Sequence, residues 1–161
     1  MALNKPSWVD AMHEELNQFK KLGVWKLVEL PKGKKSLDTR WVFRNKQDDC
    51  GVIVRNKEHL VVRGFRKIEE LDYTKVYAPV ARLEAIRIVL AYASYMGFTI
   101  YQMAVETALL YGAVKEEIYF DQPPGFVKSK FPNDVYKLDK ALYGLHQTPR
   151  AWYATLTNHL L

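Results

Sequence analysis

Two strand-like segments joined by a short turn are the feature that most constrains the fold of this chain. Residues 40–46 (RWVFRNK) and 52–62 (VIVRNKEHLVV) carry apolar and β-branched side chains that favour strands. Between them, residues 47–51 (QDDCG) have the composition of a turn, in which aspartate hydrogen-bonds to the local backbone. The pattern predicts a β-hairpin, and it assigns the Asp48-Asp49 pair to the turn rather than to a metal site.

Positive charge gathers in the part of the chain that contains this hairpin. Residues 1–67 hold 15 lysines and arginines against 8 acidic residues, whereas residues 68–161 hold 9 against 10. The asymmetry favours a surface that faces a polyanion, although a solvated basic face without a partner would have the same composition. We expect weak, salt-sensitive and sequence-independent binding of RNA or DNA. The residues expected to make these contacts are Arg40, Arg44, Lys46, Arg55, Lys57 and Arg63.

Helical spacing and alternation predict the remaining elements. Ser7 and Asp10 resemble the start of a capping box, and an apolar stripe continues from there until Gly23. A second helix is expected over residues 83–96, and Pro149 is expected to open a last helix. Further strands are expected over residues 24–30, 98–105, 116–120 and 134–138. The elements together predict a single α+β domain, in which a mixed, mostly antiparallel sheet packs with helices.

Composition excludes several classes of protein and site. Cys50 is the only cysteine, so the chain has no internal disulfide framework and fits a reducing compartment. The four histidines are scattered without the spacing of zinc ligands. The N-terminus does not resemble a signal peptide, and the longest apolar stretch, residues 88–98, is too short to span a bilayer. We expect a soluble intracellular protein of the cytoplasm or nucleus, with no membrane partner.

Five stretches of the sequence match one protein family in the same order. They are residues 8–16 (WVDAMHEEL), 41–46 (WVFRNK), 77–87 (YAPVARLEAIR), 122–126 (QPPGF) and 141–153 (ALYGLHQTPRAWY). Over most of its length the chain resembles the reverse transcriptases of copia-type LTR retrotransposons, which are the RNA-directed DNA polymerases of Pol polyproteins. The resemblance implies a truncated domain with part of the polymerase right-hand fold. Its fingers would occupy about residues 1–97 and an incomplete palm about residues 98–161.

The same resemblance places Ala104 where the family carries the first of three aspartates that hold two magnesium ions. Magnesium requires oxygen ligands, and alanine has none. The other two aspartates belong to a Tyr-x-Asp-Asp hairpin, which these 161 residues do not contain. Leu109 takes the position of the aromatic residue that senses the sugar 2′-hydroxyl, and Glu106 takes that of a basic residue. We therefore expect this chain alone to be catalytically inactive and to bind no metal ion or cofactor.

The resemblance also implies residues that contact a nucleotide or nucleic acid. The fingers strand of the family faces template or triphosphate, but His59 replaces an arginine there, which weakens the contact at neutral pH. A glutamine and an arginine near the incoming nucleotide have counterparts in the motif at residues 141–153, although that arginine is equally compatible with a structural ion pair. The candidate residues are Arg55, Lys57, Arg63, Gln147 and Arg150.

Three functions remain open at this point. The favoured one is a catalytically inactive fragment of a copia-type reverse transcriptase. The second is a polymerase piece that works only when a longer relative supplies the Asp-Asp hairpin, and the third is a nucleic-acid-binding module that keeps the basic surface. If residues 98–105 form the strand that pairs with that hairpin, an apolar sheet edge stays exposed, and we expect self-association through it.

Overall fold

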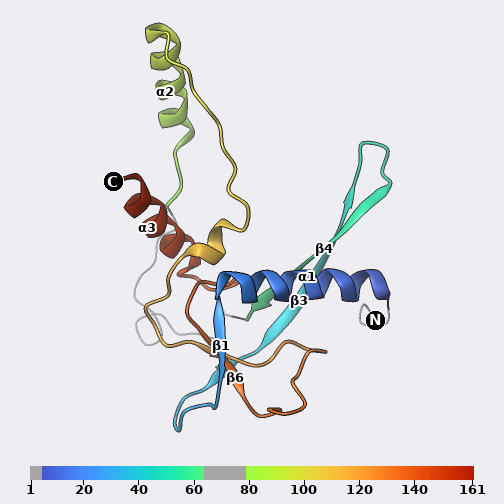
Figure 1. The fold of residues 1–161 in the computed structure, drawn as a ribbon. Coiled ribbons are helices and arrows are strands. Elements are labelled where there is room, and N and C mark those ends of the chain that lie inside the picture. Colours follow the sequence, from blue (N-terminus) through green and yellow to red (C-terminus); the bar gives the residue numbers. More distant parts are fainter. Residues whose placement is uncertain (1–4, 64–78) are drawn as a thin grey trace.

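The computed structural model describes residues 5–63 and 79–161 (Figure 1). The helices of these residues are α1 (Pro6–Leu22), α2 (Leu83–Met96), the 3-10 helix η3 (Ala108–Tyr111) and α3 (Thr148–Leu160). Their strands are β1 (Trp25–Val28), β2 (Ser36–Leu37), β3 (Thr39–Gln47), β4 (Ile53–Val62), β5 (Tyr119–Phe120) and β6 (Val135–Leu138). Helices combined with mostly antiparallel strands confirm the predicted α+β class.

A four-stranded sheet in the order β1-β6-β5-β2 joins early and late parts of the chain. β1 runs antiparallel to β6, with Trp25 opposite Leu138 and Val28 opposite Val135, and β2 runs parallel to β5. β1, β5 and β6 are shorter than the strands predicted for residues 24–30, 116–120 and 134–138, because pairing with a neighbour sets where each strand ends. The expected division into fingers and palm near residue 97 stays a prediction.

The predicted β-hairpin is confirmed, and β3 and β4 form a sheet of their own. Its turn is built by Asp48, whose carboxylate accepts hydrogen bonds from the backbone N–H groups of Cys50 at 3.0 Å and Val52 at 2.9 Å. Gly51 completes the turn with a φ of 79°, a conformation that glycine adopts without strain. The assignment of the Asp48-Asp49 pair to the turn is therefore correct.

The hydrophobic core lies between α1, the four-stranded sheet and the base of the hairpin. Phe19 of α1, Leu60 of β4 and Phe120 of β5 are fully buried. Removing a side chain of this size from water stabilises a fold by roughly 1.5–3 kcal/mol. The other buried members of the core are Val24, Val62, Leu110, Ile118, Tyr136, Leu138, Leu142 and Leu145.

The capping-box start predicted for the first helix is wrong. α1 begins at Pro6 with Lys5 as its N-cap, and no side chain caps the first turn. Proline explains the difference, because its fixed φ suits the first turn, where its missing N–H is not needed. The predicted end is confirmed, since Gly23 adopts the left-handed conformation with a φ of 63°.

The motif at residues 141–153 connects the hairpin to the last helix. The N–H of Val62, the last residue of β4, donates to the carbonyl oxygen of Tyr143 at 2.9 Å. The hydroxyl of Thr148, the first residue of α3, donates to the carbonyl oxygen of Leu142 at 2.7 Å. Between these two bonds Gly144 has a φ of 94°. A side chain there would overlap the backbone of Val62, so the close approach of the two segments depends on glycine.

Helix α2 stands away from the rest of the fold, as Figure 1 shows. The helix itself agrees with the prediction for residues 83–96, and it ends at Gly97 in the left-handed conformation. Only Ala93 of this helix is buried, whereas Leu83 and Leu90 keep 54% and 49% of their surface exposed. No helix among the described residues has both the length and the apolar character that crossing a membrane requires.

The strand predicted over residues 98–105 is wrong. This segment has no regular secondary structure, and Phe98, Ile100 and Val105 are all exposed. A strand satisfies its backbone groups by pairing with a neighbour, and no strand in the described part of the chain lies beside this segment. The expected apolar sheet edge is therefore not formed, and self-association stays a prediction.

Candidate nucleic-acid interface

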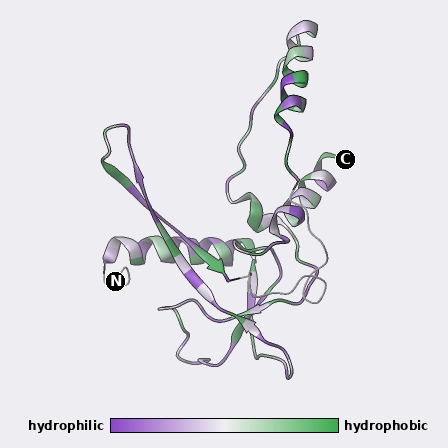
Figure 2. Ribbon diagram, turned by 180° about the vertical axis from the view of Figure 1, so that it is seen from behind, coloured by the Kyte–Doolittle hydropathy of each residue, from purple (hydrophilic) through white to green (hydrophobic). Residues whose placement is uncertain are grey.

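Four cations form two opposed pairs in the middle of the hairpin. Arg44 lies opposite Lys57, and Lys46 lies opposite Arg55. Opposite residues share one face of a sheet, as do residues two apart on a strand, so the four side chains belong to the same face. We call Arg44, Lys46, Arg55 and Lys57 the basic ladder. Figure 2 shows the strongly hydrophilic character of this part of the hairpin.

The basic ladder places like charges next to each other on an exposed surface. All four residues are exposed, and like charges directly opposite one another destabilise a sheet. A bound anion would offset this repulsion, because its charge neutralises both members of a pair. The arrangement therefore destabilises the free hairpin and favours the binding of a polyanionic ligand.

The two remaining arginines of the predicted surface lie toward the base of the hairpin. Arg40 is exposed on β3 and lies opposite Val61. Arg63 follows β4 and has its guanidinium 3.9 Å from the carboxylate of Asp38, whose carbonyl accepts the Arg63 N–H. Because Arg63 lies six residues beyond Lys57, roughly 20 Å along an extended chain, it is separate from the basic ladder.

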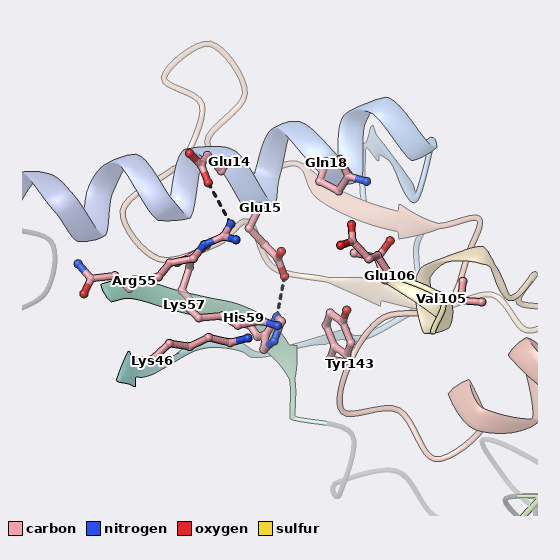
Figure 3. A pocket seen from close by; sticks show the side chains of 13 residues that line it. Glu14, Glu15, Gln18, Lys46, Arg55, Lys57, His59, Val105, Glu106 and Tyr143 are labelled. Atoms are coloured by element: carbon pink, nitrogen blue, oxygen red, sulfur yellow. Dashed lines mark hydrogen bonds and ion pairs between the residues drawn. The ribbon is translucent and has the colours of Figure 1, made fainter. Parts of the chain in front are cut away.

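A hollow that three residues of the ladder help to line brings together α1, the hairpin, the segment before η3 and the motif at residues 141–153 (Figure 3). We call it the hairpin hollow. Its basic side chains come from β3 and β4, and its acidic side chains come mainly from α1 and β4. The residues that line it are Glu14, Glu15, Gln18, Lys46, Arg55, Asn56, Lys57, Glu58, His59, Val105, Glu106, Thr107 and Tyr143.

A hydrogen-bonded pair, Glu15 and His59, connects α1 to β4 at the floor of this hollow. The Glu15 carboxylate lies 3.2 Å from Nδ1 of His59 and also accepts a hydrogen bond from the backbone N–H of Leu60. The ring of His59 packs against that of Tyr143 with centroids 4.8 Å apart. Burial raises the pKa of Glu15 above its usual 4.5, although these hydrogen bonds act in the opposite direction. The contact covers the outer edge of β4, which a two-stranded sheet would otherwise leave unpaired.

Glu58 is an acidic residue buried among these groups. It is only 7% exposed, and one of its carboxylate oxygens has no hydrogen-bond partner within the described structure. Burial raises the pKa of Glu58 above 4.5, and the neighbouring charge of Glu15 raises it further. An ionised carboxylate with one unpartnered oxygen costs stability in this position, because a buried charge that lacks part of its hydrogen bonding is poorly solvated.

Replacing Glu58 with glutamine is therefore expected to stabilise the protein near neutral pH. A carboxyl pKa that is raised in the folded state makes the fold more stable as pH falls toward 4.5 and less stable above the raised value. At pH 8 we expect Glu58→Gln to increase the free energy of unfolding by roughly 1–2 kcal/mol, and we expect this gain to shrink toward pH 5. Urea unfolding at several pH values measures the effect, with the exposed Glu29→Gln as the control. A gain that does not depend on pH would contradict the explanation.

The structure separates two of the predicted contact residues from the basic ladder. Gln147 and Arg150, at the start of α3, line a different hollow together with residues 113–116 and with Ala151 and Ala154. Gln147 is buried, and neither of its amide atoms has a hydrogen-bond partner in the described chain.

Tyr143, from the same motif, lines the hairpin hollow, and the sequence analysis did not identify it as a site residue. The available signal was an aromatic residue in the same motif, four positions before the glutamine.

The positions that correspond to catalytic-site residues in the family that the sequence resembles do not form a metal site. Ala104 is exposed in the segment after α2, Leu109 is half-buried in η3, and Glu106 lines the hairpin hollow. Within residues 5–63 and 79–161, no three acidic, histidine or cysteine side chains are arranged to hold a metal ion. Magnesium requires several oxygen ligands in octahedral geometry, and Ala104 supplies none. The residues present do not fit a magnesium site.

Comparison with known families and proteins agrees with the resemblance in the sequence. Residues 22–161 match the family described as reverse transcriptase (RNA-dependent DNA polymerase). The chain is 43% identical over 149 residues to the retrovirus-related Pol polyprotein from transposon TNT 1-94 of Nicotiana tabacum, a match that covers 92% of this chain. It is 40% identical over 161 residues, 99% of its length, to the Pol polyprotein from transposon RE1 of Arabidopsis thaliana.

The matched region is a small part of these relatives. The chain spans 11% of the length of the TNT 1-94 polyprotein and 11% of the RE1 polyprotein. The Pol polyprotein from transposon RE2 of Arabidopsis thaliana is 38% identical over 161 residues and is covered to the same extent, 11%. No solved structure matches the chain.

Proposed function

Because the chain belongs to the reverse transcriptases of copia-type retrotransposons, we propose that it binds nucleic-acid backbones through the basic ladder and does not polymerise DNA. The single observation that carries this proposal is the register of the hairpin, which sets Arg44 opposite Lys57 and Lys46 opposite Arg55. Two like-charged pairs on one exposed face favour a ligand that carries regularly spaced negative charge. A phosphodiester backbone has this property, and contacts to it carry no base sequence.

The absence of polymerisation follows from the chemistry at Ala104. Two-metal phosphoryl transfer needs carboxylates that hold both ions about 4 Å apart, and one ion must activate the attacking hydroxyl. The methyl group of Ala104 cannot bind either ion, and the one carboxylate nearby in the sequence, that of Glu106, lies on the same irregular segment and lines the hollow beside the hairpin. Leu109, which is aliphatic and half-buried, offers no aromatic ring for a sugar. The chain therefore keeps a surface for the nucleic acid and lacks the ligands for the reaction.

A fluorescent RNA or DNA primer–template tests both parts of the proposal at once. We expect the 161-residue chain to bind it at low salt, with log affinity falling by about 3 for each tenfold increase in salt if four phosphates are neutralised. With magnesium or manganese and all four deoxynucleoside triphosphates, we expect no primer extension. Ala104→Asp is also expected to give none, because one carboxylate cannot hold two metal ions.

Two results would contradict this function, and a third would support a different one. Template-directed extension by the unmodified chain would show that other residues hold the metal ions. Binding that does not change between low and physiological salt would show that phosphate contacts are not its source. Extension that appears only after a downstream segment with an Asp-Asp hairpin is added would support the alternative of a polymerase piece that needs a longer partner.

A further inference from the structure

Helix α2 carries a row of apolar side chains that the described part of the chain leaves mostly uncovered. Its members recur every three or four residues and therefore share one face of the helix. We call this row the α2 stripe, and it consists of Leu83, Ile86, Val89, Leu90, Ala93 and Met96. Ala93 is buried, and the other five keep between 44% and 60% of their surface exposed. A helix of 14 residues is marginal in water on its own, so α2 needs a surface on which to pack its stripe.

The charged residues of α2 lie away from the stripe. The helix contains two of them, Glu84 and Arg87. At about 100° per residue, Glu84 lies roughly opposite Ala93, and Arg87 lies about 120° around the helix from it. The stripe can therefore pack against a second apolar surface without burying a charge.

The segment that follows α2 adds apolar surface to the same part of the molecule. It runs back past the helix toward η3 (Figure 1), and the ring of Phe98 lies 6.1 Å from that of Tyr92 in α2. Residues 88–103 include no charged side chain. The exposed apolar side chains of the segment are Phe98, Ile100, Tyr101 and Met103. Helix and segment together form an uncharged surface that water covers at a cost in free energy.

The exposed apolar area of this region suits an interface with a second copy of the chain. Five side chains of the α2 stripe and four of the following segment contribute to it. Each presents on the order of 150 Å² and keeps about half of it exposed, which gives roughly 700 Å². The largest apolar patch of a typical monomer is about 300–600 Å², and a stable interface takes about 800 Å² from each partner. Two copies together therefore reach the range of specific complexes.

The distribution of charge favours an antiparallel pair of α2 helices. Both charged residues lie among residues 83–87, and residues 88–96 have none. An antiparallel pair places the charged part of each helix beside the uncharged part of the other, whereas a parallel pair places like charges together. The dipoles of antiparallel helices also attract each other. A twofold axis sets the same stripe of both copies face to face, which is the usual geometry of a homodimer.

We propose that two copies of this chain associate through the α2 stripe, with their α2 helices antiparallel and residues 98–103 at the side of the contact. The inference does not depend on the binding of nucleic acid, because neither the basic ladder nor the hairpin hollow includes a residue of this surface. Each copy has a net charge of +6, so the two copies repel each other and salt screens that repulsion. Salt is therefore expected to strengthen the dimer, whereas it weakens contacts with phosphates.

Sedimentation velocity of the unmodified 161-residue chain at several concentrations tests the proposal. We expect a monomer–dimer equilibrium with a dissociation constant in about the micromolar range, the weak end for an interface of this area. The double variant Ile86→Glu, Leu90→Glu places two like charges on the stripe of each copy. We expect it to weaken the dimer on the order of 100-fold, because the charges lose their water in the contact. Circular dichroism checks that the helix persists, since glutamate favours helices about as well as leucine does.

The double variant Ala91→Glu, Tyr95→Glu is the matched control. These exposed residues lie two positions before and two positions after Ala93, on the opposite face of α2. The control introduces the same charges at the same spacing, and we expect it to dimerise about as tightly as the unmodified chain. An unmodified chain that stays monomeric, or equal losses in the two double variants, would overturn the inference.

Disulfide cross-linking distinguishes this contact from association through another surface. The exposed Cys50 is first replaced by Cys50→Ser. Leu90→Cys lies near the middle of α2, and we expect it to cross-link two copies under mild oxidation. Leu83→Cys lies at the end of the helix, where antiparallel pairing keeps the two thiols roughly 20 Å apart, so we expect no cross-link. A dimer that cross-links through Leu83→Cys, or that fails to do so through Leu90→Cys, would contradict the antiparallel contact.

Discussion

Replacing Gly144 with alanine is expected to destabilise the fold severely. The new Cβ would lie 2.6 Å from Cγ1 of Val61 and would overlap the carbonyl oxygen of Val62. Gly144 also has a φ of 94°, which an L-amino acid with a side chain adopts only with strain. Relief requires the loop to move away from β4, which breaks the hydrogen bond from Val62 N–H to the Tyr143 carbonyl. We expect a loss of roughly 4 kcal/mol or more, a large part of the 5–15 kcal/mol that stabilises a typical domain.

Thermal unfolding followed by circular dichroism measures this loss. The expected decrease of the midpoint is roughly 10 °C or more for a chain of this size. Gly33→Ala is the control, because Gly33 has a similar φ of 81° but no atom within 4 Å of an added Cβ. It should lose only the cost of the left-handed conformation, roughly 1–2 kcal/mol. Equal losses in the two variants would show that backbone strain, and not the contact with β4, explains the requirement for glycine.

Neutralising the whole basic ladder is expected to abolish measurable nucleic-acid binding while leaving the protein folded. In the variant with glutamine at Arg44, Lys46, Arg55 and Lys57, affinity at low salt should fall on the order of 100-fold or more. The salt dependence should become shallower by about 3 in the log–log slope, since four phosphate contacts are lost. The hairpin should become more stable by roughly 0.5–2 kcal/mol, because two opposed pairs of like charge disappear.

The opposite signs of these two effects separate binding from folding. A variant that lost affinity because it unfolded would also lose stability, whereas this one is expected to gain it. The matched control removes the same number of charges elsewhere, from the exposed residues Lys32, Lys35, Lys128 and Lys130. We expect it to keep most of the affinity and the salt slope. Equal losses in the two variants would assign binding to net charge, and the ladder would then have no special role.

The parts of the fold that depend on local chemistry were predictable from the sequence. The hairpin and its turn were predicted because Asp48 and Gly51 supply the turn hydrogen bonds and the positive φ within five residues. The end of α1 at Gly23 and the end of α2 at Gly97 were predictable for the same reason, because glycine adopts the left-handed conformation without strain. The sequence identifies all four cations of the ladder as contact residues. It does not predict their pairing, because pairing depends on the register between strands, which composition does not determine.

Two of the three failures have a common cause in contacts between distant segments. Residues 98–105 alternate as a strand would, but no partner strand is present among the described residues, so alternation alone misled the prediction. The capping assignment at Ser7 failed for a different, local reason, since Pro6 already provides the first turn of α1. Tyr143 was missed because only the folded chain brings its ring to His59, 84 positions earlier in the sequence and 4.8 Å away.

The order in which the chain is synthesised has a consequence for the four-stranded sheet. β1 pairs with β6, where Trp25 lies opposite Leu138, so more than a hundred residues must leave the ribosome before this pair closes. At roughly 5–20 residues per second that delay lasts several seconds, whereas an isolated hairpin closes within about 10 μs. β3 and β4 therefore have time to pair with each other long before the sheet beneath them exists. The basic ladder would be displayed on a nascent chain that has no finished core.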